Sequence, residues 1–265
     1  MKRRTFCKLA FPGLGGYSLL ALTTACSRPP KPLFGTSILD LTASITPEGT
    51  TDMFGAVEAM LQVLHRGDSL AIIPVTADEQ TQATGRVLRF NLPSLHEREP
   101  YDQDLHRLIA STHSALQALK TSTLKAPYPY SDILGAFDLA AEELASRPPT
   151  ETQVLLCLSD FVQDDNRFNF KCNPALADHP SAHDLAEKLA RQNKHTFRPA
   201  TPIYLGLLPS TDFAPLSHER RQAIQDFWIE YLALLGGKPL FVVDGPGLLT
   251  SFLKDQRPPD SGWSL

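Results

Sequence analysis

The chain has 265 residues, of which 42% are hydrophobic and 20% are charged. This length and composition allow one large domain or two small ones with a sizeable core. The 25 basic and 29 acidic residues give a formal net charge of −4. That balance argues against nucleic-acid binding, which needs a basic stripe.

The first 25 residues have the features of a bacterial export signal. The basic head contains Arg3-Arg4-Thr5-Phe6-Cys7-Lys8, which resembles the twin-arginine consensus. The run Leu22-Thr23-Thr24-Ala25-Cys26 resembles a lipobox, with Cys26 as the lipidated first residue of the mature protein. The alternative is a short transmembrane anchor, but the apolar stretch is short for a span and is interrupted by glycines. We therefore expect a lipoprotein of the cell envelope that faces the periplasm or the exterior.

Removal of residues 1–25 takes away four basic residues and no acidic ones. This leaves 21 basic and 29 acidic residues, a net charge of −8. Such a chain does not bind membranes through charge, so we expect the lipid on Cys26 to provide the membrane contact. Residues 26–32 are then the lipidated cysteine and a stiff, proline-rich tether.

The hydrophobic pattern of the first half of the chain switches between strand and helix periods. The expected elements are a buried strand from Leu33 to Leu39, a helix capped by Thr50 or Thr51 that runs to about Leu64, a strand from Ser69 to Val75, a short polar edge strand from Gly85 to Phe90, and a helix from about Tyr101 to Leu119.

The second half continues in the same way. The expected elements are a helix that begins at Ser131-Asp132 and runs through Leu144, a strand from Gln153 to Ser159, a long polar loop from Phe161 to Pro180, a helix from about Ala182 to Gln192, a strand from Pro202 to Leu208, a helix from Ser217 to Leu235, and a last strand from Pro239 to Val243.

Strands that alternate with helices predict an α/β fold. We expect a doubly wound, mostly parallel six-stranded sheet with helices on both faces, in one domain over residues 33–252. Residues 253–265 form a proline-rich C-terminal tail.

Three polar clusters occur where such a sheet exposes its loops. Asp40, Thr42 and Ser44 follow the first strand, Ser131 begins a helix, and Asp160 ends a later strand. Ligands of doubly wound sheets gather at the carboxyl ends of the strands, where the strand order reverses. Hard oxygen ligands of this kind suit Mg²⁺, or Mn²⁺ or Ca²⁺. The alternative is loop and helix-cap chemistry, for which Asp, Ser and Thr are common without any metal.

This order and spacing resembles the von Willebrand factor A domain and its metal-ion-dependent adhesion site. In that family an Asp-x-Ser-x-Ser motif follows the first strand, a Thr lies on a later loop, and an Asp closes the fourth strand. The helix sequence SDILGAFDLA also resembles a family signature. The matching residues here are Asp40, Thr42 and Ser44 for the first motif, Ser131 for the Thr, and Asp160 for the final Asp.

The sequence departs from the family pattern at three positions. Thr42 and Ser131 exchange one hydroxyl residue for the other, which keeps the ligand atom. Phe161 stands where the family usually has Gly, and a bulky residue restricts such a turn. We therefore expect Asp160 to be slightly displaced or to reach the ion through water.

The resemblance implies a non-enzymatic binding protein. In the family, an acidic side chain of a protein partner completes the coordination of the metal. Two alternatives remain open: a metal-dependent hydrolase of phosphate or other esters, and a metal-free scaffold of the same fold, for which Phe161 is the main support.

Other sites are weaker. Cys157 and Cys172 either form a disulfide or are free, and a buried free cysteine is the commoner state for a core strand such as that of Cys157. His179 and His183 have helix-face spacing for zinc, but no third ligand is evident. Two further candidates lack their defining residues: a calcium loop at Asp160, Asp164 and Asp165, and a nucleotide site, which would need a phosphate-binding Gly-rich loop.

Overall fold

The computed structural model describes residues 31–61, 63–64, 67–75, 87–91, 101–125 and 130–242. The leader, Cys26 and the tail lie outside these residues, so the expectations for export, lipidation and domain limits stay predictions. Within the described residues, no helix has the length and apolar character that a membrane span requires.

Six strands form one sheet in the order β3-β2-β1-β4-β5-β6. Their bounds are β1 Leu33–Asp40, β2 Ser69–Val75, β3 Leu88–Asn91, β4 Thr152–Ser159, β5 Thr201–Leu207 and β6 Gly237–Val242. All neighbouring strands are parallel except β2 and β3, which are antiparallel. The predicted six-stranded, mostly parallel sheet is confirmed, and the short β3 lies at its edge.

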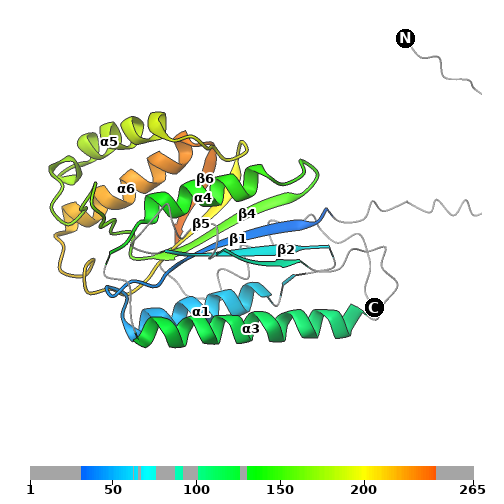
Figure 1. The fold of residues 1–265 in the computed structure, drawn as a ribbon. Coiled ribbons are helices and arrows are strands. Elements are labelled where there is room, and N and C mark those ends of the chain that lie inside the picture. Colours follow the sequence, from blue (N-terminus) through cyan, green and yellow to red (C-terminus); the bar gives the residue numbers. More distant parts are fainter. Residues whose placement is uncertain are drawn as a thin grey trace, which may run out of the picture.

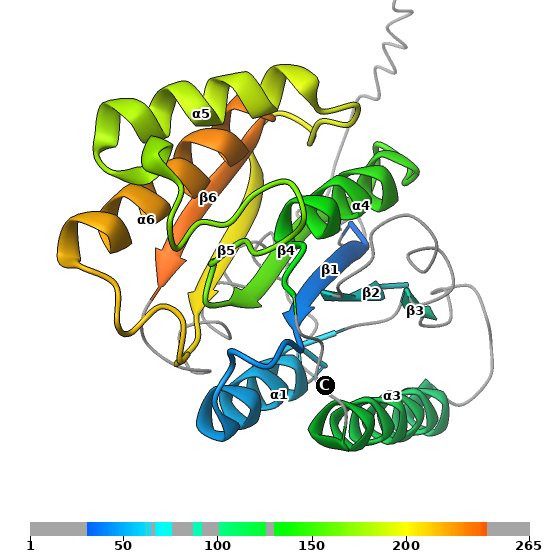
Figure 2. The ribbon, with the colours of Figure 1, turned by 60° about the vertical axis from the view of Figure 1, so that its left-hand side comes forward.

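Helices cover both faces of the sheet, as predicted (Figure 1). Their bounds are α1 Pro47–Leu61, α3 Tyr101–Lys125, α4 Ile133–Ala145, α5 His179–Gln192 and α6 His218–Leu234. Figure 2 shows α1 and α3 on one face and α4, α5 and α6 on the other. Strands buried on both faces read as continuous apolar runs, which explains the sequences of β1, β2 and β4.

The two apolar layers differ in composition. The layer beneath α1 is mainly aliphatic and includes Met53 and Met60. The layer beneath α4, α5 and α6 contains a cluster of aromatic rings around the fully buried Trp228. Trp228 contacts the rings of Phe137, Phe161, Phe170, Phe227 and Tyr231.

Helix α1 begins earlier than predicted. The Thr46 hydroxyl accepts a hydrogen bond from the Gly49 amide at 3.1 Å, and Pro47 follows at the first helical position. The predicted caps are wrong, because Thr50 and Thr51 lie inside the helix. Their hydroxyls donate to the carbonyls of Thr46 and Pro47.

Helix α5 also begins earlier than predicted, at His179. The Asp178 side chain accepts a hydrogen bond from the Ser181 amide, and Pro180 fits within the first turn. The preceding polar segment is not structureless, since Pro174–Leu176 forms a 3-10 helix (η1). Helix α3 continues six residues past its predicted end, to Lys125.

Candidate metal site at the carboxyl ends of β1 and β4

The strand order reverses between β1 and β4, which lie side by side in parallel. Asp40 is the last residue of β1, and Asp160 directly follows β4. Both carboxyl groups are fully buried. The position at which ligands of doubly wound sheets collect therefore contains two buried carboxyl groups in this chain.

The Asp40 carboxylate is held by its own loop and by the neighbouring strand. Its Oδ1 accepts hydrogen bonds from the Thr42 amide at 3.1 Å and the Thr42 hydroxyl at 2.6 Å. Its Oδ2 accepts a hydrogen bond from the Ser159 hydroxyl at 2.5 Å. Ser159 is the last residue of β4, so the parallel pairing of the two strands fixes the orientation of Asp40.

The Asp160 carboxylate is held in the same way. Its Oδ1 accepts from the Val162 amide at 2.9 Å, and its Oδ2 accepts from the Ser210 hydroxyl at 2.5 Å. Ser210 lies in the loop after β5 and also accepts from the amides of Asp212 and Phe213. Each aspartate thus uses an amide two residues along its own loop and a serine hydroxyl at the end of the next strand.

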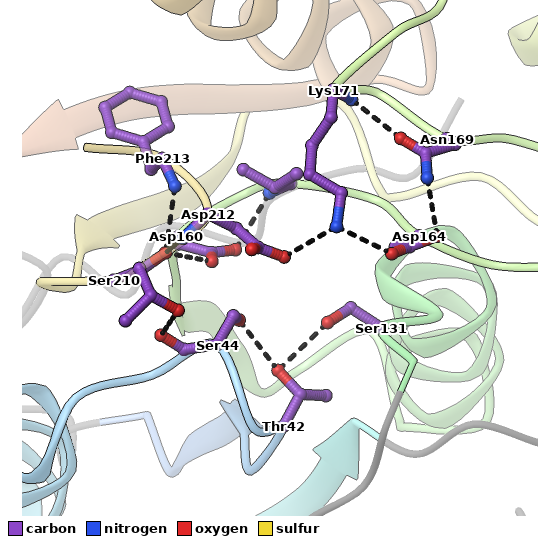
Figure 3. Close-up of polar contacts among 12 residues, drawn as sticks. Thr42, Ser44, Ser131, Asp160, Asp164, Asn169, Lys171, Ser210, Asp212 and Phe213 are labelled. Atoms are coloured by element: carbon purple, nitrogen blue, oxygen red, sulfur yellow. Dashed lines mark hydrogen bonds and ion pairs between the residues drawn. The ribbon is translucent and has the colours of Figure 1, made fainter. Parts of the chain in front are cut away.

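Three further hydroxyls line the same edge (Figure 3). The Ser131 hydroxyl donates to the Thr42 hydroxyl at 2.9 Å, and Ser44 lies 3.2 Å from Thr42 on its other side. Thr42 in turn donates to Asp40. The structure therefore brings Asp40, Thr42, Ser44, Ser131 and Asp160 to one place from three separate loops.

Ser131 is positioned by the loop after β4. Its backbone exchanges two hydrogen bonds with the backbone of Asp164, at 2.8 and 3.0 Å. In the same loop, the Gln163 side chain accepts from the amides of Ile133 and Leu134 and satisfies the first turn of α4. The helix N-terminus beside Ser131 is therefore capped by protein groups.

Burial raises the pKa of both aspartates. The pKa of Asp40 is raised mainly because its carboxylate is desolvated, against the hydrogen bonds from Ser159 and Thr42. Burial and the nearby charge of Asp40 raise the pKa of Asp160 to about 7, against hydrogen bonds from Ser210, Val162 and Ser44. Within the described part of the chain, no Lys, Arg or His pairs with either carboxylate.

These residues fit a small divalent cation. Two buried carboxyl groups at one edge of the sheet, which no described basic residue contacts, form an environment that a cation would stabilise. Carboxylate and hydroxyl oxygens are the ligands that Mg²⁺ and Mn²⁺ accept. The Oδ2 atoms of Asp40 and Asp160 each accept one serine hydrogen bond and can accept a second interaction. The site could therefore hold an ion through Asp40, Asp160 and the hydroxyls of Thr42, Ser44 and Ser131.

Phe161 makes the turn after Asp160 despite its bulk. Its φ is +61°, a left-handed conformation that costs a residue with a Cβ roughly 1–2 kcal/mol. The ring is fully buried against Trp228 and Phe241, and the Trp228 indole donates to the Phe161 carbonyl at 2.9 Å. Aromatic packing and this hydrogen bond offset the backbone strain.

A rim of partly exposed charges surrounds the buried carboxylates. The Lys171 ammonium lies 3.0 Å from Asp164 and 2.9 Å from Asp212 (Figure 3). Arg167 pairs with Asp165 nearby.

Of the described residues, none form a group of three or more His, Cys, Asp or Glu suited to a metal ion. The candidate site differs from such groups because it combines only two carboxylates with hydroxyls.

The sequence missed two residues of this arrangement, Ser159 and Ser210. Ser159 is the last residue of β4, and Ser210 lies in the loop that follows the end of β5 at Leu207, so both are at the edge of the sheet that the sequence had already singled out. The loop after β5 was not considered as part of the site. A search for hydroxyls at every strand end, rather than for one motif, would have found them.

The weaker candidates have other roles. Cys157 is buried and free and Cys172 is exposed and free, so the disulfide alternative is wrong. His179 pairs with Asp226, and His183 lies 3.4 Å from Glu230. Asp164 forms an ion pair with Lys171, and Asp165 forms an ion pair with Arg167.

No family model matches the sequence, and no curated protein matches it significantly. Among solved structures, the chain is similar to a von Willebrand factor type A protein from Catenulispora acidiphila, with 14% identity and a TM-score of 0.43 over 85% of this chain and 42% of that one. It is also similar to the manganese-loaded TRAP protein of Plasmodium vivax, with 16% identity and a TM-score of 0.39 over 77% and 72%.

A third similar structure is the pilus adhesin SpaC from Lactobacillus rhamnosus GG, with 11% identity and a TM-score of 0.46 over 85% of this chain and 30% of that one. The chain thus spans less than half of the length of two of these three proteins. At such identities and TM-scores, these likenesses alone establish neither a family nor a function.

Proposed function

We propose that this protein is a lipid-anchored, extracytoplasmic binding protein that holds a divalent cation and uses it to bind an acidic side chain of a protein partner. The observation that supports the proposal is the convergence of five oxygen-bearing side chains, two of which are buried carboxyl groups that no described basic residue neutralises. The same five positions match the adhesion-site motif in sequence.

The charge of the site explains why binding would require the ion. Two carboxylates and three neutral hydroxyls leave a bound divalent cation with unsatisfied coordination, which a carboxylate from a partner can complete. The negative net charge of the mature chain disfavours acidic partners that do not reach the ion. In this scheme Asp40 and Asp160 supply the charged ligands of the cation, and the hydroxyls of Thr42, Ser44 and Ser131 supply neutral ones.

The anchor is a separate part of the proposal and rests on the leader sequence. Cys26 carries the lipid, and residues 27–32 separate the domain from the membrane surface. Membrane fractionation of a Cys26→Ser form tests it. The variant should be unprocessed or soluble; a variant that stays membrane-bound at the mature size would contradict the anchor.

Thermal unfolding of the wild type and Asp40→Ala, in EDTA and in millimolar Mn²⁺, tests the cation site. Mn²⁺ should stabilise the wild type by about 2.7 kcal/mol at a hundredfold excess over its dissociation constant. In EDTA, Asp40→Ala should cost about 1–3 kcal/mol, because the Thr42 amide and the hydroxyls of Thr42 and Ser159 lose their acceptor, and this outweighs the removal of one of two close like charges. It should abolish the gain from Mn²⁺.

A matched control is Asp184→Ala, which removes one carboxylate from an exposed position on α5. This variant should keep the full gain from Mn²⁺. A wild type that is indifferent to divalent ions would refute the cation site. Hydrolysis of phosphate or other esters that depends on Mn²⁺ and vanishes in Asp40→Ala would favour the hydrolase instead.

One observation favours a second candidate, a metal-free scaffold. All four oxygens of Asp40 and Asp160 already accept a hydrogen bond from the protein. A network that is complete in this way can hold the two loops together without an ion. In that case Mn²⁺ and EDTA would give the same unfolding curve for the wild type, while Asp40→Ala would be destabilised in both.

A further inference from the structure

Lys171 bridges two loops beside the candidate cation site. Its ammonium lies 3.0 Å from Asp164 in the loop after β4 and 2.9 Å from Asp212 in the loop after β5 (Figure 3). Asp164 pairs with the backbone of Ser131, and the amide of Asp212 donates to the hydroxyl of Ser210. Each of the two outer carboxylates thus belongs to a residue that is hydrogen-bonded to a serine of the inner site.

The lysine is held in this position rather than free in solvent. Its amide donates to the Asn169 side chain at 3.0 Å, and the Asn169 side chain donates to the Asp164 carboxylate at 3.0 Å. The Lys171 side chain is only 35% exposed. Because the loop fixes both ends of the contact, the positive charge stays beside Asp164 and Asp212.

The charged side chains of the rim lie close to the inner carboxylates. The amide of Asp212 donates to the Ser210 hydroxyl, which donates to the Asp160 carboxylate, so the charge of Asp212 lies close to the buried pair. Lys171 offsets that field at close range. Arg167, the other cation of this loop, pairs instead with Asp165 and lies 3.5 Å from Asp132. The balance of charge at the rim therefore depends on Lys171.

We propose that Lys171 determines how tightly the candidate site holds a divalent cation, because its ammonium neutralises Asp164 and Asp212 and repels the ion. This inference rests on the proposed function. Removing one positive charge beside a divalent ion strengthens the attraction of the remaining carboxylates. A site adjusted in this way holds its ion firmly only when another carboxylate is added, which is the charge that an acidic partner brings.

Calorimetric titration of the full-length chain with Mn²⁺ at low salt measures this effect. Lys171→Met should bind Mn²⁺ about threefold to tenfold more tightly than the wild type. Lys171→Arg keeps the charge and should stay within about twofold. Lys188→Met, which removes the same charge from an exposed position on α5, should bind like the wild type. Asp212→Asn should bind several-fold more weakly.

The outcomes separate this inference from the proposed function. If the wild type binds Mn²⁺, Asp40→Ala does not, and Lys171→Met binds no more tightly, then the role of Lys171 is overturned while the cation site stands. If the wild type binds no Mn²⁺, the proposed cation site fails and the inference with it. Should Lys171→Met fail to fold in EDTA, Asp212→Asn decides, since an unchanged affinity in that variant overturns the inference.

Discussion

The loops after β1 and β4 hold their aspartates by one pattern but stabilise it differently. In both, an amide two residues later and a serine hydroxyl from the adjacent strand end bind the two carboxylate oxygens. The loop after β1 adds Thr42, whose hydroxyl lies within the same short motif. The loop after β4 depends instead on Phe161, whose strained backbone is fixed by Trp228 on α6.

The two aspartates of this site are therefore oriented by different kinds of contact. Asp40 is oriented by its immediate sequence neighbours and by strand pairing. Asp160 is oriented through Phe161, whose turn is fixed by Trp228, a buried residue 67 positions after Phe161. Changes in the aromatic layer should therefore disturb Asp160 far more than Asp40.

The largest expected effect comes from Trp228→Ala. Loss of a fully buried ring should destabilise the protein by about 3–5 kcal/mol in chemical denaturation. Trp228→Phe, which keeps most of the packing and leaves the Phe161 carbonyl without its donor, should cost about 1–3 kcal/mol. If Trp228→Phe left both stability and Mn²⁺ affinity unchanged, the indole hydrogen bond would not be what fixes the turn at Asp160.

The pH dependence of stability is the second effect. The folded-state pKa of Asp160 is raised to about 7 from an ordinary value of 3.8. Because the folded state binds the proton more tightly, this contribution to stability is complete below pH 3.8 and is lost as the pH rises through about 7. In EDTA the protein should lose about 2–4 kcal/mol between these limits.

The measurement is thermal unfolding against pH in EDTA. Asp160→Asn should make this part of the profile less steep, because the amide does not titrate and only the raised pKa of Asp40 still contributes. Mn²⁺ should reverse the trend, since it binds the deprotonated pair. A wild-type profile that rises from pH 4 to pH 7 in EDTA would contradict the raised pKa.

The smallest effect comes from a matched pair of serine variants. Ser159→Ala removes the donor to Asp40 and one acceptor, for the Phe161 amide, and should cost about 1 kcal/mol. Ser210→Ala removes the donor to Asp160 and the acceptor for two amides, and should cost about 2 kcal/mol. Equal costs in urea unfolding would show that the additional amide contact at Ser210 contributes nothing.

Much of the site could be predicted from sequence because its residues follow directly from strand ends. An apolar run that stops at a carboxylate identifies both Asp40 and Asp160, and a parallel sheet places such ends at the same edge. Their role as metal ligands stays a prediction. The starts of α1 and α5 were predicted too late, since in each helix an earlier side chain caps the first turn and a proline lies within it.

The sequence by itself determined the alternation of strands and helices and the oxygen-rich loop after β1, since both depend on local periodicity and on neighbours two residues apart. Only the tertiary structure decided the partners of Asp160, the left-handed turn at Phe161 and the bridge made by Lys171. These contacts join residues up to about 70 positions apart. Strand order and packing bring them together, and no pattern within a single segment encodes them.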